Sequence, residues 1–102
     1  MAGVNQILKQ AQKMQAKLQE AQSQLASRRF DASVAGGAVI ATVNGQGQMV
    51  DLKLDAGFLK DTPAELVSSM ILNAIKQAQD NATKASEALM GDFAGPLKGI
   101  LG

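Results

Sequence analysis

Residues 30–54, FDASVAGGAVIATVNGQGQMVDLKL, decide the fold of this chain. Apolar and polar residues alternate over 30–34 and again over 49–54, which is the two-residue period of a strand with one buried face. Between these segments, residues 39–43 form a short β-branched run. Gly36-Gly37 and the Asn-Gly-Gln-Gly segment at 44–47 separate the three runs with residues that tolerate positive φ. The stretch predicts a three-stranded antiparallel meander, and the second turn is either tight or a longer loop with a bulge.

A long helix is predicted before the strands. Residues 4–28 contain no Gly or Pro and are rich in Gln, Ala, Lys and Leu, which favour helix. Their apolar positions step by three and four, as in the a/d repeat of a coiled-coil seam. The predicted dimer or helix-packing seam comprises Val4, Ile7, Ala11, Met14, Leu18, Ala21 and Leu25. Its partner is either the second helix of the chain or a helix of a second subunit.

A second long helix is predicted after the strands and a short connector at 55–60. Thr62-Pro63-Ala64-Glu65 combines a capping box with proline in the first turn, and Gly91 stands where a helix C-cap is expected. The remaining eleven residues contain Gly95-Pro96 and further glycines, so we expect a flexible tail. The predicted organisation is one α+β domain over residues 1–91, followed by a flexible C-terminal tail over 92–102.

The predicted helices are much longer than the predicted strands. Each helix spans nearly 40 Å at about 1.5 Å per residue, roughly twice the length of a strand of five or six residues. Each must therefore overhang the sheet, so the sequence predicts a body with projecting helical arms.

The apolar content consists mostly of small aliphatic residues, with only three Phe as aromatics. A thin core in a chain of 102 residues favours association with a second subunit.

The composition argues against catalysis. The chain has no His and no Cys, so the common general base and the soft metal ligands are absent, and we expect no enzyme activity, no metal and no cofactor. No signal peptide or membrane span is visible, and the absence of Cys gives no support for an oxidising compartment. These features predict a cytoplasmic protein.

Positive charge is concentrated in the first helix. Although the net charge of the chain is only +1, residues 1–30 contain five basic residues and a single acid, Glu20. Lys9, Lys13 and Lys17 recur at i, i+4 and i+8, which places three ammonium groups in one stripe. Phosphates of a duplex could meet such a stripe with release of counterions, but the solvated face of a coiled coil explains it equally well. Secondary phosphate candidates are Arg28, Arg29, Lys76 and Lys84.

Three segments carry a resemblance to a known family. Residues 9–15, KQAQKMQ, closely resemble the opening helix of the YbaB/EbfC family of nucleoid-associated proteins. Residues 36–55 resemble its central hairpin, and residues 71–90 its closing helix. The segment Ala56-Gly57 departs from many members, and the second helix is poorer in charge than usual.

The resemblance implies a tweezer-like homodimer, with strands at the centre and helical arms outside, that is associated with the nucleoid. Such a dimer would bind double-stranded DNA with little sequence preference, alter DNA conformation and so affect gene expression. It also implies that Lys9, Lys13 and Lys17 contact DNA, with Lys76 and Lys84 as weaker candidates. The alternative hypothesis is a coiled-coil protein-interaction module without direct nucleic-acid binding, whose partner would survive nuclease treatment in a pull-down.

Overall fold

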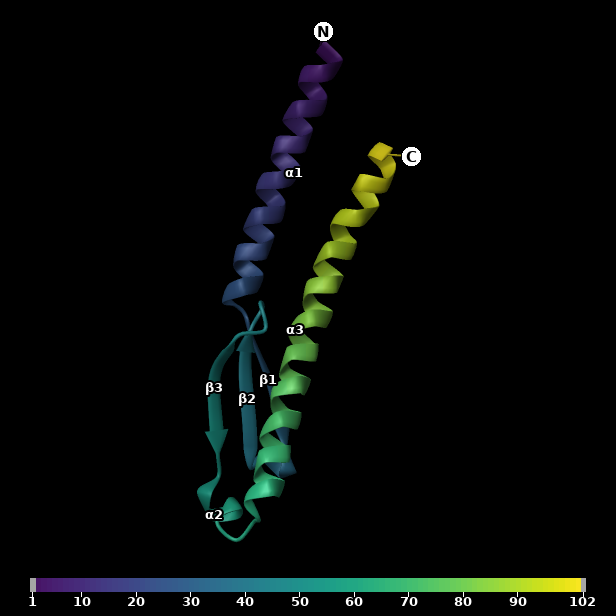
Figure 1. Cartoon of the computed structure of the whole chain (residues 1–102). Coiled ribbons are helices and arrows are strands. Elements are labelled where there is room, and N and C mark those ends of the chain that lie inside the picture. The colour runs from purple at the N-terminus through teal and green to yellow at the C-terminus, as the bar shows by residue number, and fades with distance from the viewer. Residues whose placement is uncertain (1, 102) are drawn as a thin grey trace.

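The computed structural model describes the backbone of residues 2–101 and the side chains of residues 3–91. The predicted order of a long helix, three strands and a second long helix is confirmed (Figure 1). In chain order the elements are α1 (Ala2–Ser27), β1 (Arg29–Val34), the 3-10 segment η1 (Ala35–Gly37), β2 (Val39–Asn44), β3 (Met49–Leu54), α2 (Ala56–Leu59) and α3 (Ala64–Leu101).

The strands form one antiparallel sheet in the order β1-β2-β3, as the sequence predicts. Ala32 of β1 and Leu52 of β3 both pair with Ala41 of the central strand. The register shifts between Thr42 and Val43 against β3, so the bulged form of the second turn is the observed one. A loop of residues 45–48 closes this turn.

The core lies between α3 and one face of the sheet. Val39, Ala41 and Val43 alternate along β2 on this face and are fully buried. They pack with Ala74, Ala78 and Ala82, which recur every four residues on α3 and therefore share one helix face. Alanine at these positions lets the helix approach the sheet closely. The result is the thin core that the aliphatic composition predicts.

This close approach leaves no room for a larger side chain on α3. We expect Ala78→Leu to destabilise the fold by about 1–3 kcal/mol, because added methylenes in a packed core force neighbours to shift. For a domain of this size, each kcal/mol lowers the melting temperature by about 4–8 °C. Thermal denaturation followed by circular dichroism measures the shift, with Gln77→Leu on the exposed side of α3 as the control. Equal melting temperatures for the two variants would show that Ala78 is not tightly packed.

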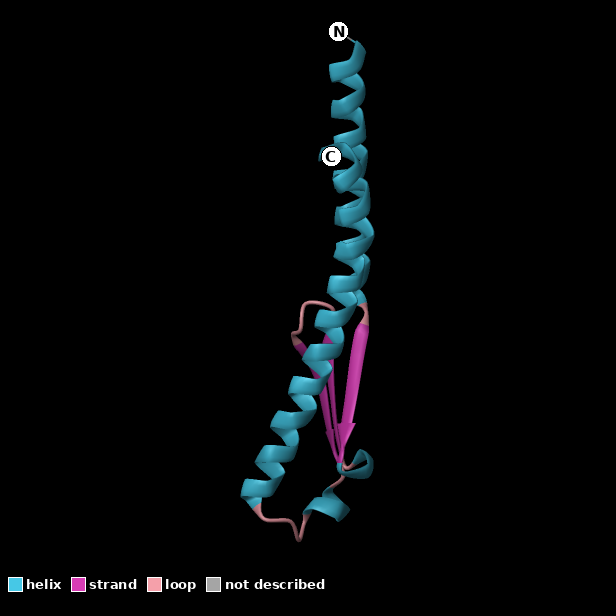
Figure 2. Cartoon of the chain, turned by 90° about the vertical axis from the view of Figure 1, so that its right-hand side faces the viewer, coloured by secondary structure: helices cyan, strands magenta, loops and turns pink. Residues whose placement is uncertain are grey.

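Both long helices project beyond the sheet, as their lengths predict. α3 crosses the sheet and continues past it, whereas α1 leaves the same end of the sheet and does not cover a face (Figures 1 and 2). The molecule is accordingly elongated, with extents of 73 × 22 × 17 Å. Among the described residues, no helix has an apolar stretch long enough to cross a membrane.

The connector at 55–60 differs from the prediction because it contains a short helix, α2. The Asp55 carboxylate caps this helix by accepting a hydrogen bond from the Phe58 backbone nitrogen at 3.3 Å. The Thr62 hydroxyl donates to the Phe58 carbonyl oxygen at 3.3 Å. It therefore bonds to a carbonyl of α2 and does not cap α3. α3 starts one residue later than the predicted capping box requires, with the Pro63 carbonyl accepting from the Val67 nitrogen at 3.1 Å.

The predicted end of the second helix at Gly91 is wrong, because the backbone of α3 continues to Leu101. Gly91 is not among the glycines with positive φ, which a C-cap of the expected type requires. A glycine inside a helix costs only about 1 kcal/mol, which does not terminate a long helix. Side chains 92–102 lie outside the described part of the chain, and the flexibility predicted for this segment stays a prediction.

Candidate nucleic-acid interface

The three lysines of the predicted stripe lie on the exposed part of the α1 arm. Lys9, Lys13 and Lys17 are all exposed and belong to the helix that leaves the sheet (Figure 1). Along a helix of 1.5 Å rise they span about 12 Å, and successive members turn by about 40° around the axis. Glutamines occupy many of the positions around them, and Glu20 is the only acid of α1. The arm therefore presents positive charge with little competition from carboxylates.

The apolar seam of α1 is covered by its own chain only near the sheet. Leu25 is buried and Leu18 and Met14 are half-buried, whereas Ala11, Ile7 and Val4 are exposed. Leu25 and Ala21 line a small cleft of about 140 Å³ together with Ala85 and Leu89 of α3. α3 is thus the partner for the base of the seam, the part nearest the sheet. The outer half has the same heptad spacing, but its residues Val4, Ile7 and Ala11 are not covered by any helix within residues 3–91.

The side chains of Arg28 and Arg29 lie in different surroundings. The Arg28 guanidinium carbon lies 5.0 Å from the centroid of the Phe30 ring, a cation–π distance. Arg29 is the first residue of β1 and faces the side of the sheet away from α3, because the alternate residue Phe30 packs against the core. The two guanidinium groups do not form one anion site with the lysine stripe.

Lys76 and Lys84 lie on the solvent side of α3, but acids interrupt them. Asp80 stands four residues from each lysine on the same helix face, and Glu87 follows Lys84 by three. All four residues are exposed. The i, i+4 spacing of Asp80 is visible in the sequence and is the signal that identifies α3 as the weaker candidate. Of the two projecting helices, α1 is the more positively charged along its described part.

The open face of the sheet carries carboxylates, which sequence reasoning does not assign to a common surface. Thr42 pairs with Asp31 on one side and with Asp51 on the other, so the two acids flank it. The Thr42 hydroxyl donates to Asp31 Oδ1 at 2.8 Å and is itself nearly buried. Within residues 3–91, no group of three potential ligands gathers to hold a metal ion. Arg29 and Lys53 lie on the same face of the sheet, so two basic residues balance the two acids and this face carries no net charge.

An exposed apolar surface lies on β3 and α2. Leu52 and Leu54 pair with core residues of β2, so they lie on the same sheet face as the core, yet they are 38% and 47% exposed. The reason is that α3 packs on β1 and β2 and leaves β3 largely uncovered (Figure 1). Phe58 of α2 is also exposed, at 54%. We call Met49, Leu52, Leu54 and Phe58 the β3 patch.

Beside the β3 patch, the surface is hollowed. A depression of about 570 Å³ lies between the end of β3, α2 and the start of α3, and it is lined by Leu54, Leu59 and Val67 among others. The alternation in the sequence predicts a buried face for β3. It does not predict that α3 leaves this face largely uncovered.

Comparison with known proteins gives consistent matches over almost the whole chain. Residues 1–97 match the sequence model of the YbaB/EbfC DNA-binding family. A nucleoid-associated protein of Rickettsia akari is 35% identical over 98% of this chain and 91% of its own length. One from Caulobacter vibrioides is 32% identical over 100% of this chain and 94% of its own. The crystal structure of the uncharacterized protein HP0035 from Helicobacter pylori superimposes with a TM-score of 0.75 at 19% identity, covering 88% of this chain and 95% of that one, and so shares the fold.

Proposed function

Because this chain belongs to the YbaB/EbfC DNA-binding family, we propose that it binds double-stranded DNA with little sequence preference through the lysines of α1. The observation that carries the proposal is the stripe of Lys9, Lys13 and Lys17 on a projecting helix with one acid. Phosphates are the complement of such a stripe, since pairing releases counterions and relieves repulsion among the lysines. Arg28, Arg29, Lys76 and Lys84 belong to the proposal as peripheral phosphate contacts.

The working unit in this proposal is a homodimer formed through the β3 patch. Leu52 and Leu54 extend the core face of the sheet but stay partly exposed in the described part of the chain, so association would complete a core that is otherwise thin. A second copy presents the same apolar patch beside the same depression, and a two-fold axis brings like patches together. The dimer would carry two basic arms, and therefore six lysines of the stripe.

The outer half of the α1 seam has a place in the same assembly. Val4, Ile7 and Ala11 continue the heptad spacing of Leu18 and Leu25, which already pack at the base of the arm. We propose that a helix of the second copy covers these outer positions, so that the arms are stiffened as a coiled coil in a tweezer-like dimer. The lysines lie to the side of the seam and would stay free for DNA.

In this proposal, such binding places the protein on the nucleoid, and the names of two relatives as nucleoid-associated proteins support it. A dimer that grips phosphates on two arms would change the path of the duplex and so influence gene expression. No catalytic turnover is part of the proposal, because no step of this binding needs a reactive group. The comparisons offer nothing that favours the protein-interaction alternative.

The test is the salt dependence of binding to random and A/T-rich duplexes, measured by fluorescence anisotropy. The six stripe lysines of a dimer contribute about −5 to the slope of the logarithm of the association constant against the logarithm of salt concentration, at about −0.9 per contact, and peripheral contacts would make the slope steeper. This slope corresponds to a loss of about 10³ in affinity between 50 and 200 mM salt. The two duplexes should bind with similar affinity, since phosphate contacts carry no sequence information. A flat slope, or a strong preference for one duplex, contradicts the proposal.

A further inference from the structure

The turn between β2 and β3 touches the end of α1. A Cβ atom on Gly45 would lie 2.5 Å from the carbonyl carbon of Leu25 and 2.8 Å from its Cγ. Carbon atoms in contact are normally about 3.5–4.0 Å apart, so only glycine fits here. Gly45 does not have positive φ, unlike Gly47 in the same turn. The contact with α1, and not the backbone conformation, is what requires glycine at position 45.

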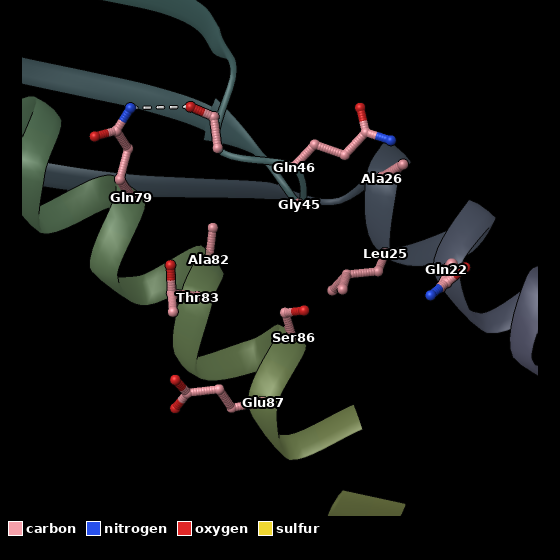
Figure 3. A pocket seen from close by; sticks show the side chains of 11 residues that line it. Gln22, Leu25, Ala26, Gly45, Gln46, Gln79, Ala82, Thr83, Ser86 and Glu87 are labelled. Carbon is pink, nitrogen blue, oxygen red and sulfur yellow. Dashed lines mark hydrogen bonds between the residues drawn. The ribbon is translucent and has the colours of Figure 1, made fainter. Parts of the chain in front are cut away.

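The turn is itself fastened to the body of the molecule. Gln79 of α3 donates a hydrogen bond from Nε2 to the Gly47 carbonyl oxygen at 3.1 Å (Figure 3). Within the turn, Asn44 Oδ1 accepts from the backbone nitrogens of Gln46 at 2.9 Å and Gln48 at 3.0 Å. A continuous chain of contacts therefore runs from α3 through the turn to the last turn of α1.

The rest of the α1 arm has little support from the side chains of residues 3–91. Arg28 is the only residue between α1 and β1. An open cavity of about 690 Å³ separates the end of α1 from α3, with Gln22 and Ala26 on one side and Thr83 and Ser86 on the other (Figure 3). The side chains of residues 3–13 are all exposed. Within one subunit the arm thus has room to tilt, and the contact at its base sets the direction in which it meets the second copy.

We infer that the β2–β3 turn is a socket for the α1 arm and that Gly45 is a positioning residue for DNA binding. This inference rests on the proposed function, because its consequence is the placement of the lysine stripe. Lys9 lies sixteen residues from Leu25, about 24 Å along the helix axis. A tilt of about 10° at the base would move Lys9 by about 4 Å along its arc. Charges on a duplex repeat about every 1.7 Å along the axis, so such a movement changes which phosphates the stripe meets.

The experiment compares Gly45→Ala with the parent protein in arm direction and DNA binding. The chain has no Cys, so Gln10→Cys on α1 and Asn73→Cys on α3 allow two spin labels in one subunit. Labelled protein is diluted with unlabelled protein, so that electron–electron double resonance reports distances within a subunit. We expect the mean distance to change by about 3 Å or more, following the lever arm of the helix. DNA affinity should fall about tenfold with a shallower salt slope, as fewer phosphates are engaged at once.

Two further variants separate arm position from general damage to the turn. Gly47→Ala strains the same turn, because φ there is +81°, but its Cβ would meet nothing within 4 Å. It should leave the mean label distance unchanged. Gln79→Ala removes the hydrogen bond that fastens the turn to α3. It should broaden the distance distribution around the parent mean, because the socket is loosened without being displaced.

The inference is overturned if folded Gly45→Ala keeps the parent distance, or if Gly47→Ala shifts it equally. If Gly45→Ala does not fold, the Gln79→Ala variant tests the inference. A distribution of label distances as narrow as that of the parent then overturns it. Failure of the proposed function is a separate result, because it appears as DNA binding that does not depend on the lysines of α1. If binding needs those lysines but the socket variants change neither distance nor affinity, only this inference fails.

Discussion

Replacing Lys9, Lys13 and Lys17 together by Gln should reduce DNA affinity by about 100-fold or more at 50 mM salt, as expected when six phosphate contacts are lost from a dimer. The salt slope should become less negative by about 5, because each lost contact removes about 0.9. Gln keeps the helix propensity of Lys, and all three positions are exposed, so the fold should be unaffected. Fluorescence anisotropy over a salt series measures both quantities, and circular dichroism checks the fold.

The matched control lowers the net charge by the same three units elsewhere on the molecule. Lys53 and Lys60 are exposed residues outside the proposed contacts, and Lys53→Glu combined with Lys60→Gln gives the same net charge as the α1 variant. We expect this control to lose less than about fivefold in affinity, since general electrostatic attraction is largely screened beyond about 10 Å. Parent-like affinity of the α1 variant, or equal losses in the two variants, would show that the stripe is not the DNA contact.

The second large effect is expected at the β3 patch. Leu52→Asp combined with Leu54→Asp should convert the dimer to a monomer at micromolar concentrations. Burying a leucine side chain contributes about 1.5–3 kcal/mol, and four such side chains would be lost from a two-fold interface. Every 1.4 kcal/mol is tenfold in the dissociation constant, so a rise of at least about 10³ is expected. Analytical ultracentrifugation measures the constant directly.

The same strand supplies the control for this prediction. Lys53→Asp introduces an acid between the two leucines, but on the opposite face of the sheet, because side chains alternate along a strand. It should leave the dimer largely intact. If the double leucine variant stays dimeric while folded, the interface lies elsewhere on the molecule.

Loss of the dimer should also change DNA binding in a defined way. A monomer has one arm with three lysines of the stripe, so its salt slope should fall to about half, near −3. This outcome ties the two predictions together, because it requires both the arm lysines and the pairing of subunits. An unchanged slope in a monomeric variant would mean that a single subunit makes all the contacts.

Local patterns in the sequence account for the elements and for the principal charged surface. The alternation in residues 30–54 and the heptad spacing in residues 4–25 depend on neighbours a few residues apart, and both correspond to observed elements. The helix lengths alone predict projecting arms, because rise per residue is fixed for helix and strand. The spacing of Lys9, Lys13 and Lys17 defines a stripe as soon as the segment is helical.

Short-range signals are less informative where two local structures compete. The Thr62-Pro63 segment reads as a capping box, but the Thr62 hydroxyl bonds to Phe58 of the neighbouring helix α2. Gly91 reads as a helix end, but α3 passes through it. In both cases the free-energy difference between the alternatives is about 1 kcal/mol, which is too small for a local pattern to decide.

By itself, the sequence determined the α+β order of elements, the strand segments, the projecting helices and the lysine stripe, because these follow from periodicity within each segment. Only the tertiary structure decided that α3 covers two of three strands, which leaves Leu52 and Leu54 exposed. It also decided that Gly45 meets Leu25 at the base of the arm. Such contacts join segments about twenty or more residues apart, and their geometry depends on how whole elements pack, which no spacing within a segment encodes.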